Sequence, residues 1–360
     1  MRGVIRSAAK RVEVVELPRP RLEPGTAIVR VGAAGICGSD LHGYRAGGRP
    51  QERPEGHEVA GRVVEIAPRD GETGERIREG DLVAIDTICL GRACGDCRWC
   101  REGAFFHCRQ KRQGPDWSGA FAEYVKRDVR GLFPLPAGMI VEEGALVEPL
   151  AVAVHALRLA ELRPGESMAI IGAGTIGMAS LLAAVAMDAR DVYVLARHPH
   201  QADLARALGA AEAIVDEPRA AAEQVRDRTQ GQGVDLVVET VGGDAPTLDQ
   251  AWPMLRQRGR VAALGLFGKQ VPVDLSAPLG KEATLLFPVC YGEREGVHDF
   301  QVAIDLIASR KAPAERLITH RFALEQAAEA FATADDKSTR SVKVQFSLPA
   351  RTQMNADASR

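Results

Sequence analysis

Hydrophobic and polar positions alternate in short runs through the first 150 residues of the chain. Ala27–Val31 and Val59–Ile66 are two such runs, and turns that contain glycine or proline, such as Pro24-Gly25 and Gly47-Gly48, separate the runs. Alternation with a period of two between turn signals is typical of β-strands. The pattern therefore predicts a β-rich domain over residues 1–150.

From about Leu150 the pattern changes to apolar strands that alternate with helices. The expected elements, in chain order, are strand Met168–Ile171, helix Ile176–Met187, strand Val192–Ala196, helix Gln201–Gly209, and strands Ala213–Val215, Val234–Glu239 and Arg260–Leu264. Such alternation implies an α/β domain, in which helices cover both faces of a parallel sheet. Beyond it we expect helices at Phe300–Ser309 and Leu324–Ala332 and a strand at Ser341–Phe346.

The composition is that of a globular protein of about two domains. Hydrophobic residues make up 46% and charged residues 26% of the 360 positions, which excludes disordered and fibrous classes. The 46 Lys and Arg against 48 Asp and Glu leave a net charge of −2, so we expect no nucleic-acid partner and no membrane partner. The N-terminus has no continuous apolar segment of the kind found in signal peptides, and we expect a cytoplasmic protein.

One segment imitates a membrane span. Met168–Met187 is twenty uncharged, mostly apolar residues, long enough for a transmembrane helix. Glycines near its start are left unexplained by a single span, whereas a buried strand, a glycine turn and a helix account for them. We therefore expect a strand, a turn and a helix here.

Those glycines form a Gly-x-Gly-x-x-Gly pattern between the expected strand and helix, the context of a dinucleotide site. Gly172 permits the tight turn, Gly174 lets the backbone approach a pyrophosphate, and Gly177 lets the helix pack on the strand. The free N–H groups at the start of the helix then face the phosphates. A small-residue packing turn without a ligand is the alternative. The residues predicted to bind the cofactor here are Gly172, Gly174, Thr175, Ile176 and Gly177.

The end of the next strand indicates which cofactor is bound. NAD-specific sites have an Asp or Glu there, about 20 residues beyond the glycines. Here Ala196 stands nineteen residues after Gly177, and Arg197 and His198 follow it. This position therefore has no carboxylate that would repel the 2′-phosphate of NADP, and the guanidinium of Arg197 can pair with that phosphate. We predict NADP, bound in part by these three residues; the alternative is a surface arginine on an enzyme that accepts both cofactors.

Four of the seven cysteines are crowded into one short segment. Cys94, Cys97, Cys100 and Cys108 have the spacing C-x2-C-x2-C-x7-C. Four thiolates this close can complete a closed tetrahedral zinc shell of the structural kind. The alternatives are unmetallated cysteines and a nucleic-acid-binding zinc module, which nearby arginines and aromatic residues would suit. The balanced charge of the chain disfavours the second alternative.

A second group of metal-binding side chains is dispersed along the chain. Cys37, His57 with Glu58, and Glu148 supply one thiolate, one imidazole and one or two carboxylates. These are enough for an incomplete zinc shell, and catalytic zinc keeps three protein ligands and one open position. Taken singly, each residue is also typical of a buried cysteine or a hydrogen-bonded turn.

With these motifs in this order, the chain resembles the zinc-dependent medium-chain alcohol dehydrogenases over nearly its whole length. The motifs that carry the resemblance are Gly35–His42 (GICGSDLH), Gly56–Glu58 (GHE), the four cysteines, Glu148–His155 (EPLAVAVH) and Gly172–Gly177 (GAGTIG). The polyol, threonine and sugar dehydrogenase branch is the most similar, because Glu148 stands where the simple-alcohol branch has Cys.

The resemblance implies a division into domains. A GroES-like catalytic domain would cover residues 1–150, carry the structural-zinc lobe at 94–108 and be completed by a C-terminal return over 289–348. A Rossmann domain, a doubly wound parallel sheet, would cover 151–288, and 349–360 would be a flexible tail.

The resemblance also implies roles for the site residues. Cys37, His57 and Glu148 would bind catalytic zinc, with Glu58 able to enter or leave the shell. Ser39 would take the substrate proton and pass it by way of the cofactor ribose to His42. Asp40 would orient His57. The alternatives are that Ser39 caps a helix and that His42 is an ordinary surface histidine.

We therefore predict a zinc- and NADP-dependent alcohol dehydrogenase. It would transfer hydride between the cofactor and a secondary alcohol, polyol, sugar or amino alcohol, and act as a homodimer or homotetramer. Two alternatives stay open: a zinc-independent reductase of the same fold, and a non-catalytic NADP-binding sensor or scaffold that keeps only the structural zinc.

Overall fold

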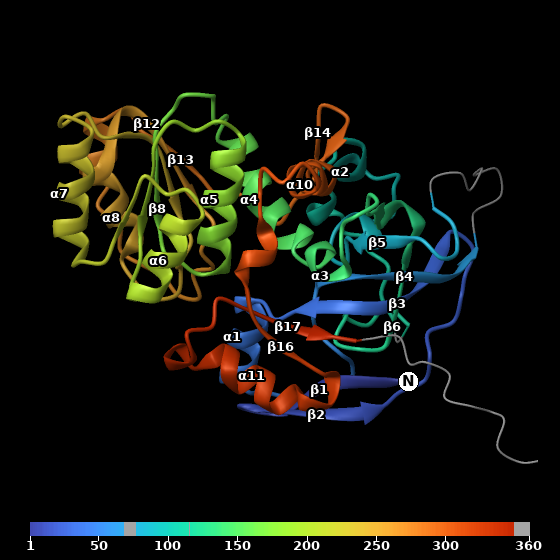
Figure 1. The fold of residues 1–360 in the computed structure, drawn as a ribbon. Coiled ribbons are helices and arrows are strands. Elements are labelled where there is room, and N and C mark those ends of the chain that lie inside the picture. The colour runs from blue at the N-terminus through green and yellow to red at the C-terminus, as the bar shows by residue number, and fades with distance from the viewer. Residues whose placement is uncertain (68–76, 115, 349–360) are drawn as a thin grey trace, which may run out of the picture. The chain divides into compact units, whose positions relative to one another are not determined.

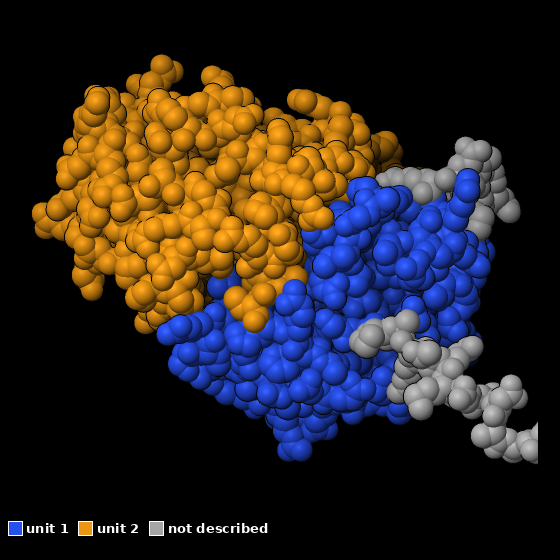
Figure 2. Space-filling model, viewed as in Figure 1, with its two compact units in different colours: residues 1–87, 112–145, 320–360 blue, residues 88–111, 146–319 orange. Residues whose placement is uncertain are grey.

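The computed structural model describes residues 1–67, 77–114 and 116–348, so the predicted tail at 349–360 lies outside the described residues. The chain forms two compact units (Figure 1, Figure 2). Unit 1 comprises Met1–Thr87, Arg112–Ala145 and His320–Arg360, and unit 2 comprises Ile88–Lys111 and Leu146–Thr319.

Unit 1 is built on a seven-stranded sheet in the order β16-β17-β3-β4-β5-β7, with β6 also paired to β3. The strands of this sheet are β3 (Thr26–Gly35), β4 (Glu58–Ala67), β5 (Leu82–Ile85), β6 (Tyr124–Asp128), β7 (Leu132–Pro134), β16 (Ile318–Phe322) and β17 (Lys343–Ser347). A separate two-stranded antiparallel sheet pairs β1 (Arg2–Ala8) with β2 (Arg11–Glu16). The helices of unit 1 are α1 (Gly38–Ala46), α3 (Val141–Gly144) and α11 (Ala327–Asp335). The predicted strands Ala27–Val31 and Val59–Ile66 are confirmed as parts of β3 and β4.

The core of unit 1 joins segments that are far apart in sequence. Val29 and Val63, from β3 and β4, are buried with Phe121, Phe331 and Phe346. The ring of Phe121 lies 5.6 Å from that of Phe331 and 5.4 Å from that of Phe346. This packing fixes the C-terminal strand β17 against β3 at the end of the sheet where the predicted ligand Cys37 lies.

Unit 2 contains a six-stranded parallel sheet in the order β10-β9-β8-β11-β12-β13. Its strands are β8 (Met168–Ile171), β9 (Val192–Leu195), β10 (Glu212–Ile214), β11 (Val234–Glu239), β12 (Leu255–Ala263) and β13 (Thr284–Leu286), and β14 (Glu293–Arg294) pairs with β15 (Val297–His298). Its helices are α2 (Arg98–Arg101), α4 (Val147–Leu159), α5 (Thr175–Ala186), α6 (Pro199–Ala207), α7 (Pro218–Arg228), α8 (Thr247–Met254), α9 (Ser276–Gly280) and α10 (Asp299–Ala308). Short 3₁₀ segments of the chain lie at Leu90–Arg92, Phe105–His107, Val129–Gly131, Ala314–Leu317, Leu324–Gln326 and Lys337–Thr339.

This strand order is that of the doubly wound dinucleotide-binding fold, which confirms the predicted fold class. The residues of β8 are all buried, and since successive strand residues face opposite sides, both faces of the sheet are covered. The order reverses between β8 and β11, and ligands of such sheets bind at that point beyond the carboxyl ends of the strands.

The segment that imitates a membrane span is β8, a turn and α5, as expected. Within the described ranges, none of the helices combines the length and the apolar character needed to cross a membrane.

The compact units differ from the predicted domains in three places. The cysteine segment, residues 146–150 and residues 289–319 belong to unit 2, whereas the predicted domains assign all three to the catalytic domain. The cysteine segment is joined to residues 289–319 by a 2.9 Å hydrogen bond from Glu293 N–H to the Gly103 carbonyl and by a ring stack between Phe105 and His298 at 5.8 Å. Because units defined by contacts are not the same as domains, the domain limits stay a prediction.

Candidate active site and metal centres

Three of the predicted zinc ligands meet at the ends of two neighbouring strands. β3 ends at Gly35, just before Cys37, and β4 begins at Glu58, directly after His57. The strands are antiparallel with Gly35 opposite Glu58, so the end of one meets the start of the other. One ligand atom each from Cys37, His57 and Glu58 lies within 4.8 Å of the other two. A thiolate, an imidazole and a carboxylate this close form a donor set that fits zinc.

Asp40 contacts two of these residues. Its Oδ2 accepts a 2.8 Å hydrogen bond from the Cys37 N–H, and its Oδ1 lies 3.8 Å from His57 Nδ1. Burial raises the pKa of Asp40 to about 6, against the opposing effects of His57 and the Cys37 N–H. Because 3.8 Å exceeds hydrogen-bond length, the predicted orienting bond from Asp40 to His57 stays a prediction.

Glu58 has a partner that the sequence did not indicate. Lys343, on β17, donates to both carboxylate oxygens of Glu58, at 2.7 and 2.6 Å, and both side chains are buried. The available signal was a lysine among the polar positions of the alternating last strand, Lys343–Ser347. This signal did not identify the partner, because no local sequence pattern pairs Lys343 with Glu58.

The predicted relay residues lie on α1. The helix begins at Gly38 with Cys37 as its N-cap, so Ser39 is the second helical residue and the alternative in which Ser39 caps the helix is wrong. Ser39 is half-buried and His42 is exposed. Residues three apart on a helix share a face, so a hydroxyl and an imidazole follow one another toward solvent. This arrangement suits a proton path, and the relay itself stays a prediction.

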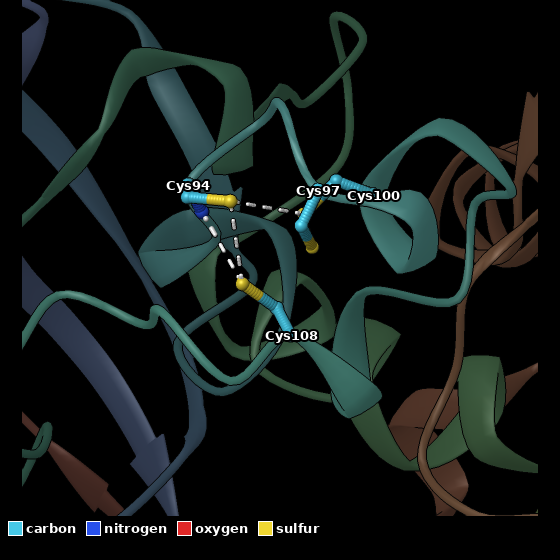
Figure 3. Close-up of side chains that lie close together, drawn as sticks. All are labelled: Cys94, Cys97, Cys100 and Cys108. Atoms are coloured by element: carbon cyan, nitrogen blue, oxygen red, sulfur yellow. Dashed lines mark hydrogen bonds between the residues drawn. The ribbon is translucent and has the colours of Figure 1, made fainter.

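The four-cysteine segment in unit 2 brings its sulfur atoms together (Figure 3). The Sγ–Sγ distances are 3.5 Å for Cys97 to Cys100, 3.6 Å for Cys94 to Cys108 and 3.8 Å for Cys94 to Cys100. These are far longer than a disulfide bond of about 2.05 Å. Four sulfurs bound tetrahedrally at about 2.3 Å from zinc would lie about 3.8 Å apart. The arrangement therefore fits a closed zinc shell.

The pKa values of two of these thiols are shifted in opposite directions. Backbone N–H groups of Cys97 and Asp96 lower the pKa of Cys94 to about 6. Burial raises the pKa of Cys100 to about 12, so without a cation this thiol keeps its proton at neutral pH. A metal ion that replaces the proton would remove the cost of a buried thiolate.

The glycine turn after β8 has the geometry of a phosphate cradle. Gly172 has φ of 99°, in the left-handed region, and a Cβ there would lie 2.7 Å from Val241 Cγ2. A Cβ at Gly177 would overlap the carbonyl oxygen of Gly172, so α5 could not pack where it does. A Cβ at Gly174 would meet nothing within 4 Å, so open space lies beside the backbone. Thr175 then begins α5, and its N-terminus faces the turn. This cradle fits a dinucleotide pyrophosphate.

The predicted 2′-phosphate residues lie at the carboxyl end of β9, the strand next to β8. Ala196 is buried directly after the strand, Arg197 is exposed, and His198 is the N-cap of α6. The ring of His198 stacks on that of His200, with centroids 5.6 Å apart. Within the part of the chain that the structure describes, Arg197 has no hydrogen bond or ion pair, which leaves its guanidinium available to a ligand.

A buried carboxylate that the sequence motifs did not indicate lies at the carboxyl end of β11, next to the glycine turn. Glu239, fully buried at the end of β11, accepts 2.8 Å hydrogen bonds on Oε1 from Val241 N–H, Gly242 N–H and Thr247 Oγ1. It therefore fixes the loop that touches the glycine turn. The sequence signal for this residue was an acidic side chain at the end of the apolar run Val234–Glu239.

The remaining predicted ligand, Glu148, is buried in the first turn of α4 and belongs to unit 2. Cys37, His57 and Glu58 belong to unit 1. The participation of Glu148 in the same zinc shell stays a prediction.

Comparison with known proteins identifies the family. The model of the alcohol dehydrogenase GroES-like domain matches residues 23–137, and that of the zinc-binding dehydrogenases matches residues 175–309. Sorbitol dehydrogenase of Bacillus subtilis is 30% identical over 338 residues, 92% of each chain. L-threonine 3-dehydrogenase of Pyrococcus horikoshii is 33% identical over 316 residues, 86% of this chain and 88% of the relative. The solved structure of alcohol dehydrogenase TADH from Thermus sp. ATN1 has a TM-score of 0.83 and 32% identity, and the match covers 97% of this chain and 100% of that one.

The protein is therefore a zinc-binding dehydrogenase with a GroES-like and a dinucleotide-binding part. It belongs to the zinc-dependent medium-chain alcohol dehydrogenases, and its activity is that of an oxidoreductase that uses a nicotinamide cofactor.

Proposed function

We propose that this chain is a zinc-dependent, NADP-linked dehydrogenase of a secondary alcohol, polyol, sugar or amino alcohol. The observation that carries the proposal is the meeting of Cys37, His57 and Glu58 at the ends of β3 and β4. Similarity to a sorbitol dehydrogenase and an L-threonine 3-dehydrogenase supports this range of substrates, since both of their named substrates carry a secondary hydroxyl group.

In this proposal Cys37, His57 and Glu148 hold catalytic zinc, and Glu58 lies beside the shell. When bound there, zinc would supply Lewis acidity toward the substrate hydroxyl, and the nicotinamide cofactor would supply the hydride chemistry. Asp40 fixes the Cys37 backbone through its 2.8 Å hydrogen bond. Ser39 accepts the hydroxyl proton, and the exposed imidazole of His42 releases it to solvent.

The preference for NADP rests on charge at the end of β9. Arg197 is exposed and unpaired among the described residues, and buried Ala196 stands where an acid would hold the ribose hydroxyls of NAD. A 2′-phosphate would gain a charge-assisted pair with the guanidinium.

Replacing Arg197 with alanine should therefore raise the KM for NADP about tenfold and change that for NAD less than about twofold. Steady-state kinetics with both cofactors measures this, with Arg219→Ala on α7 as an exposed-arginine control. Equal effects on the two cofactors would show that Arg197 does not bind the phosphate.

The zinc content tests the whole proposal. Protein purified without chelators should contain about two zinc ions per chain and oxidise secondary alcohols or polyols with NADP. About one zinc per chain, without turnover of any such substrate, would favour the sensor that keeps only the structural zinc.

We also propose that the enzyme is a homodimer or homotetramer. β13 is the edge of the parallel sheet as described, and Leu275, Leu279 and Phe287 near it are 69%, 81% and 63% exposed. Large apolar side chains beside an unpaired strand edge are typical of an interface. Sedimentation velocity should give the mass of a dimer or tetramer, and a monomer would contradict the proposal.

A further inference from the structure

The ion pair between Lys343 and Glu58 connects the C-terminal strand with the candidate zinc site. Lys343 Nζ donates to both oxygens of Glu58, at 2.7 and 2.6 Å, and to the Ile36 carbonyl at 3.0 Å. Ile36 precedes Cys37 and Glu58 follows His57, so one ammonium group binds the sequence neighbours of both of these predicted ligands. Lys343 and Glu58 are both 0% exposed, so water does not screen their charges.

The sheet explains how the lysine reaches the carboxylate. β3 lies between β17 and β4, so Lys343 must reach across β3 to contact Glu58. The pairing places Gly35 of β3 opposite both Gln345 of β17 and Glu58 of β4. A Cβ at Gly35 would overlap the carboxylate of Glu58. Glycine at this position therefore leaves the space in which the ion pair forms.

Lysine and a metal ion would compete for this carboxylate. An oxygen of Glu58 lies within 4.8 Å of the ligand atoms of Cys37 and His57, close enough for Glu58 to join a zinc shell that these residues hold. Both oxygens are already engaged by Nζ, so coordination requires Glu58 to give up at least one of these bonds. Two cations that are attracted to one buried carboxylate also repel each other.

We propose that Lys343 is a positioning residue that holds Glu58 out of the zinc shell. This inference rests on the proposed function, since it takes zinc to bind at Cys37 and His57. Lys343 keeps a coordination position open for substrate and weakens zinc binding in doing so. By linkage, zinc in turn weakens the pairing of Lys343 with Glu58.

The test measures zinc affinity in the full chain. Lys343→Met should bind zinc about tenfold more tightly than the wild type at the site that Cys37→Ala removes, measured by competition with a fluorescent chelator. In the Glu58→Gln background the same substitution should tighten zinc binding by a smaller factor, because only the direct repulsion between the ammonium group and zinc is then removed. If Cys37→Ala removes no zinc, the proposed function fails; if it removes one and Lys343→Met does not tighten zinc binding, only this inference fails.

Thermal unfolding separates this role from a purely structural one. Metal-free Lys343→Met should melt below the wild type, and added zinc should raise its melting temperature by more than it raises that of the wild type. Lys126→Met is the matched control, since Lys126 is also 0% exposed, pairs with Glu23 at 2.7 Å, and lies opposite Ile28 on β3, away from the Gly35 end of that strand. It should lower stability without changing the response to zinc.

A second variant covers the case in which Lys343→Met fails to fold without metal. Lys343→Gln keeps a hydrogen-bond donor but loses the charge, and should also bind zinc more tightly, by a smaller factor. Lys343→Arg keeps the charge and should bind zinc as the wild type does. Where Lys343→Met does not fold, weaker or unchanged zinc binding in Lys343→Gln would overturn the inference.

Discussion

Replacing Cys100 with serine is expected to remove one zinc ion per chain and to lower the free energy of unfolding by several kcal/mol. Cys100 Sγ lies 3.5 Å from that of Cys97 and 3.8 Å from that of Cys94, within the group that fits a tetrahedral shell. Structural zinc contributes about 10–16 kcal/mol in zinc-finger peptides, which sets an upper bound. The lobe has little regular structure of its own, since α2 and the 3₁₀ segment Phe105–His107 are one turn each. Its other ties are the contacts of Gly103 and Phe105 with residues 293–298.

Elemental analysis and thermal unfolding with and without a chelator measure the effect. Cys290→Ser is the matched control, because Cys290 is also a free cysteine of unit 2 but lies outside the group. It should keep both zinc ions and nearly the wild-type melting temperature. Full zinc content in Cys100→Ser, or equal destabilisation by the two substitutions, would refute a structural zinc site at these cysteines.

Sites whose residues lie close together in the chain could be predicted from the sequence. The four cysteines lie between positions 94 and 108, and the glycine turn is recognised from the strand before it and the helix after it. The resemblance supplied the grouping of Cys37 with His57 and Glu58, which the pairing of β3 with β4 brings within 4.8 Å.

Partners distant in sequence could not be predicted. Lys343 meets Glu58 because β17 returns to the sheet beside β3, and no local pattern specifies that pairing. The helices α4 and α7 were also missed. α4 is buried over nine of its thirteen positions and so lacks a polar face, and α7 has mostly charged and alanine residues with only Ala221, Ala222 and Val225 buried.

Two glycines of the turn after β8 should respond to alanine in opposite ways, because they serve different purposes. Gly174→Ala should leave the melting temperature within about 2 °C of the wild type, since the new Cβ meets nothing within 4 Å and φ there is −79°, which alanine adopts freely. The same Cβ would occupy the open space beside the backbone that the pyrophosphate needs. We therefore expect cofactor affinity to fall about 100-fold or more.

Gly177→Ala should instead damage the fold. Its Cβ would overlap the carbonyl oxygen of Gly172, a backbone atom that can move only if α5 shifts away from β8. Overpacking of this kind costs about 1–3 kcal/mol or more, so the melting temperature should fall together with cofactor affinity.

Cofactor titration by fluorescence and thermal unfolding of both variants measure the two effects. Gly231→Ala would be a poor control, because its φ of 79° makes alanine strained there whatever the space. Gly38, at the start of α1 in unit 1, lies outside the left-handed region and has nothing within 4 Å of an added Cβ, so Gly38→Ala is a better reference for stability. If Gly174→Ala bound the cofactor as tightly as the wild type, the turn would be a packing device, and the dinucleotide would have to bind elsewhere on the sheet.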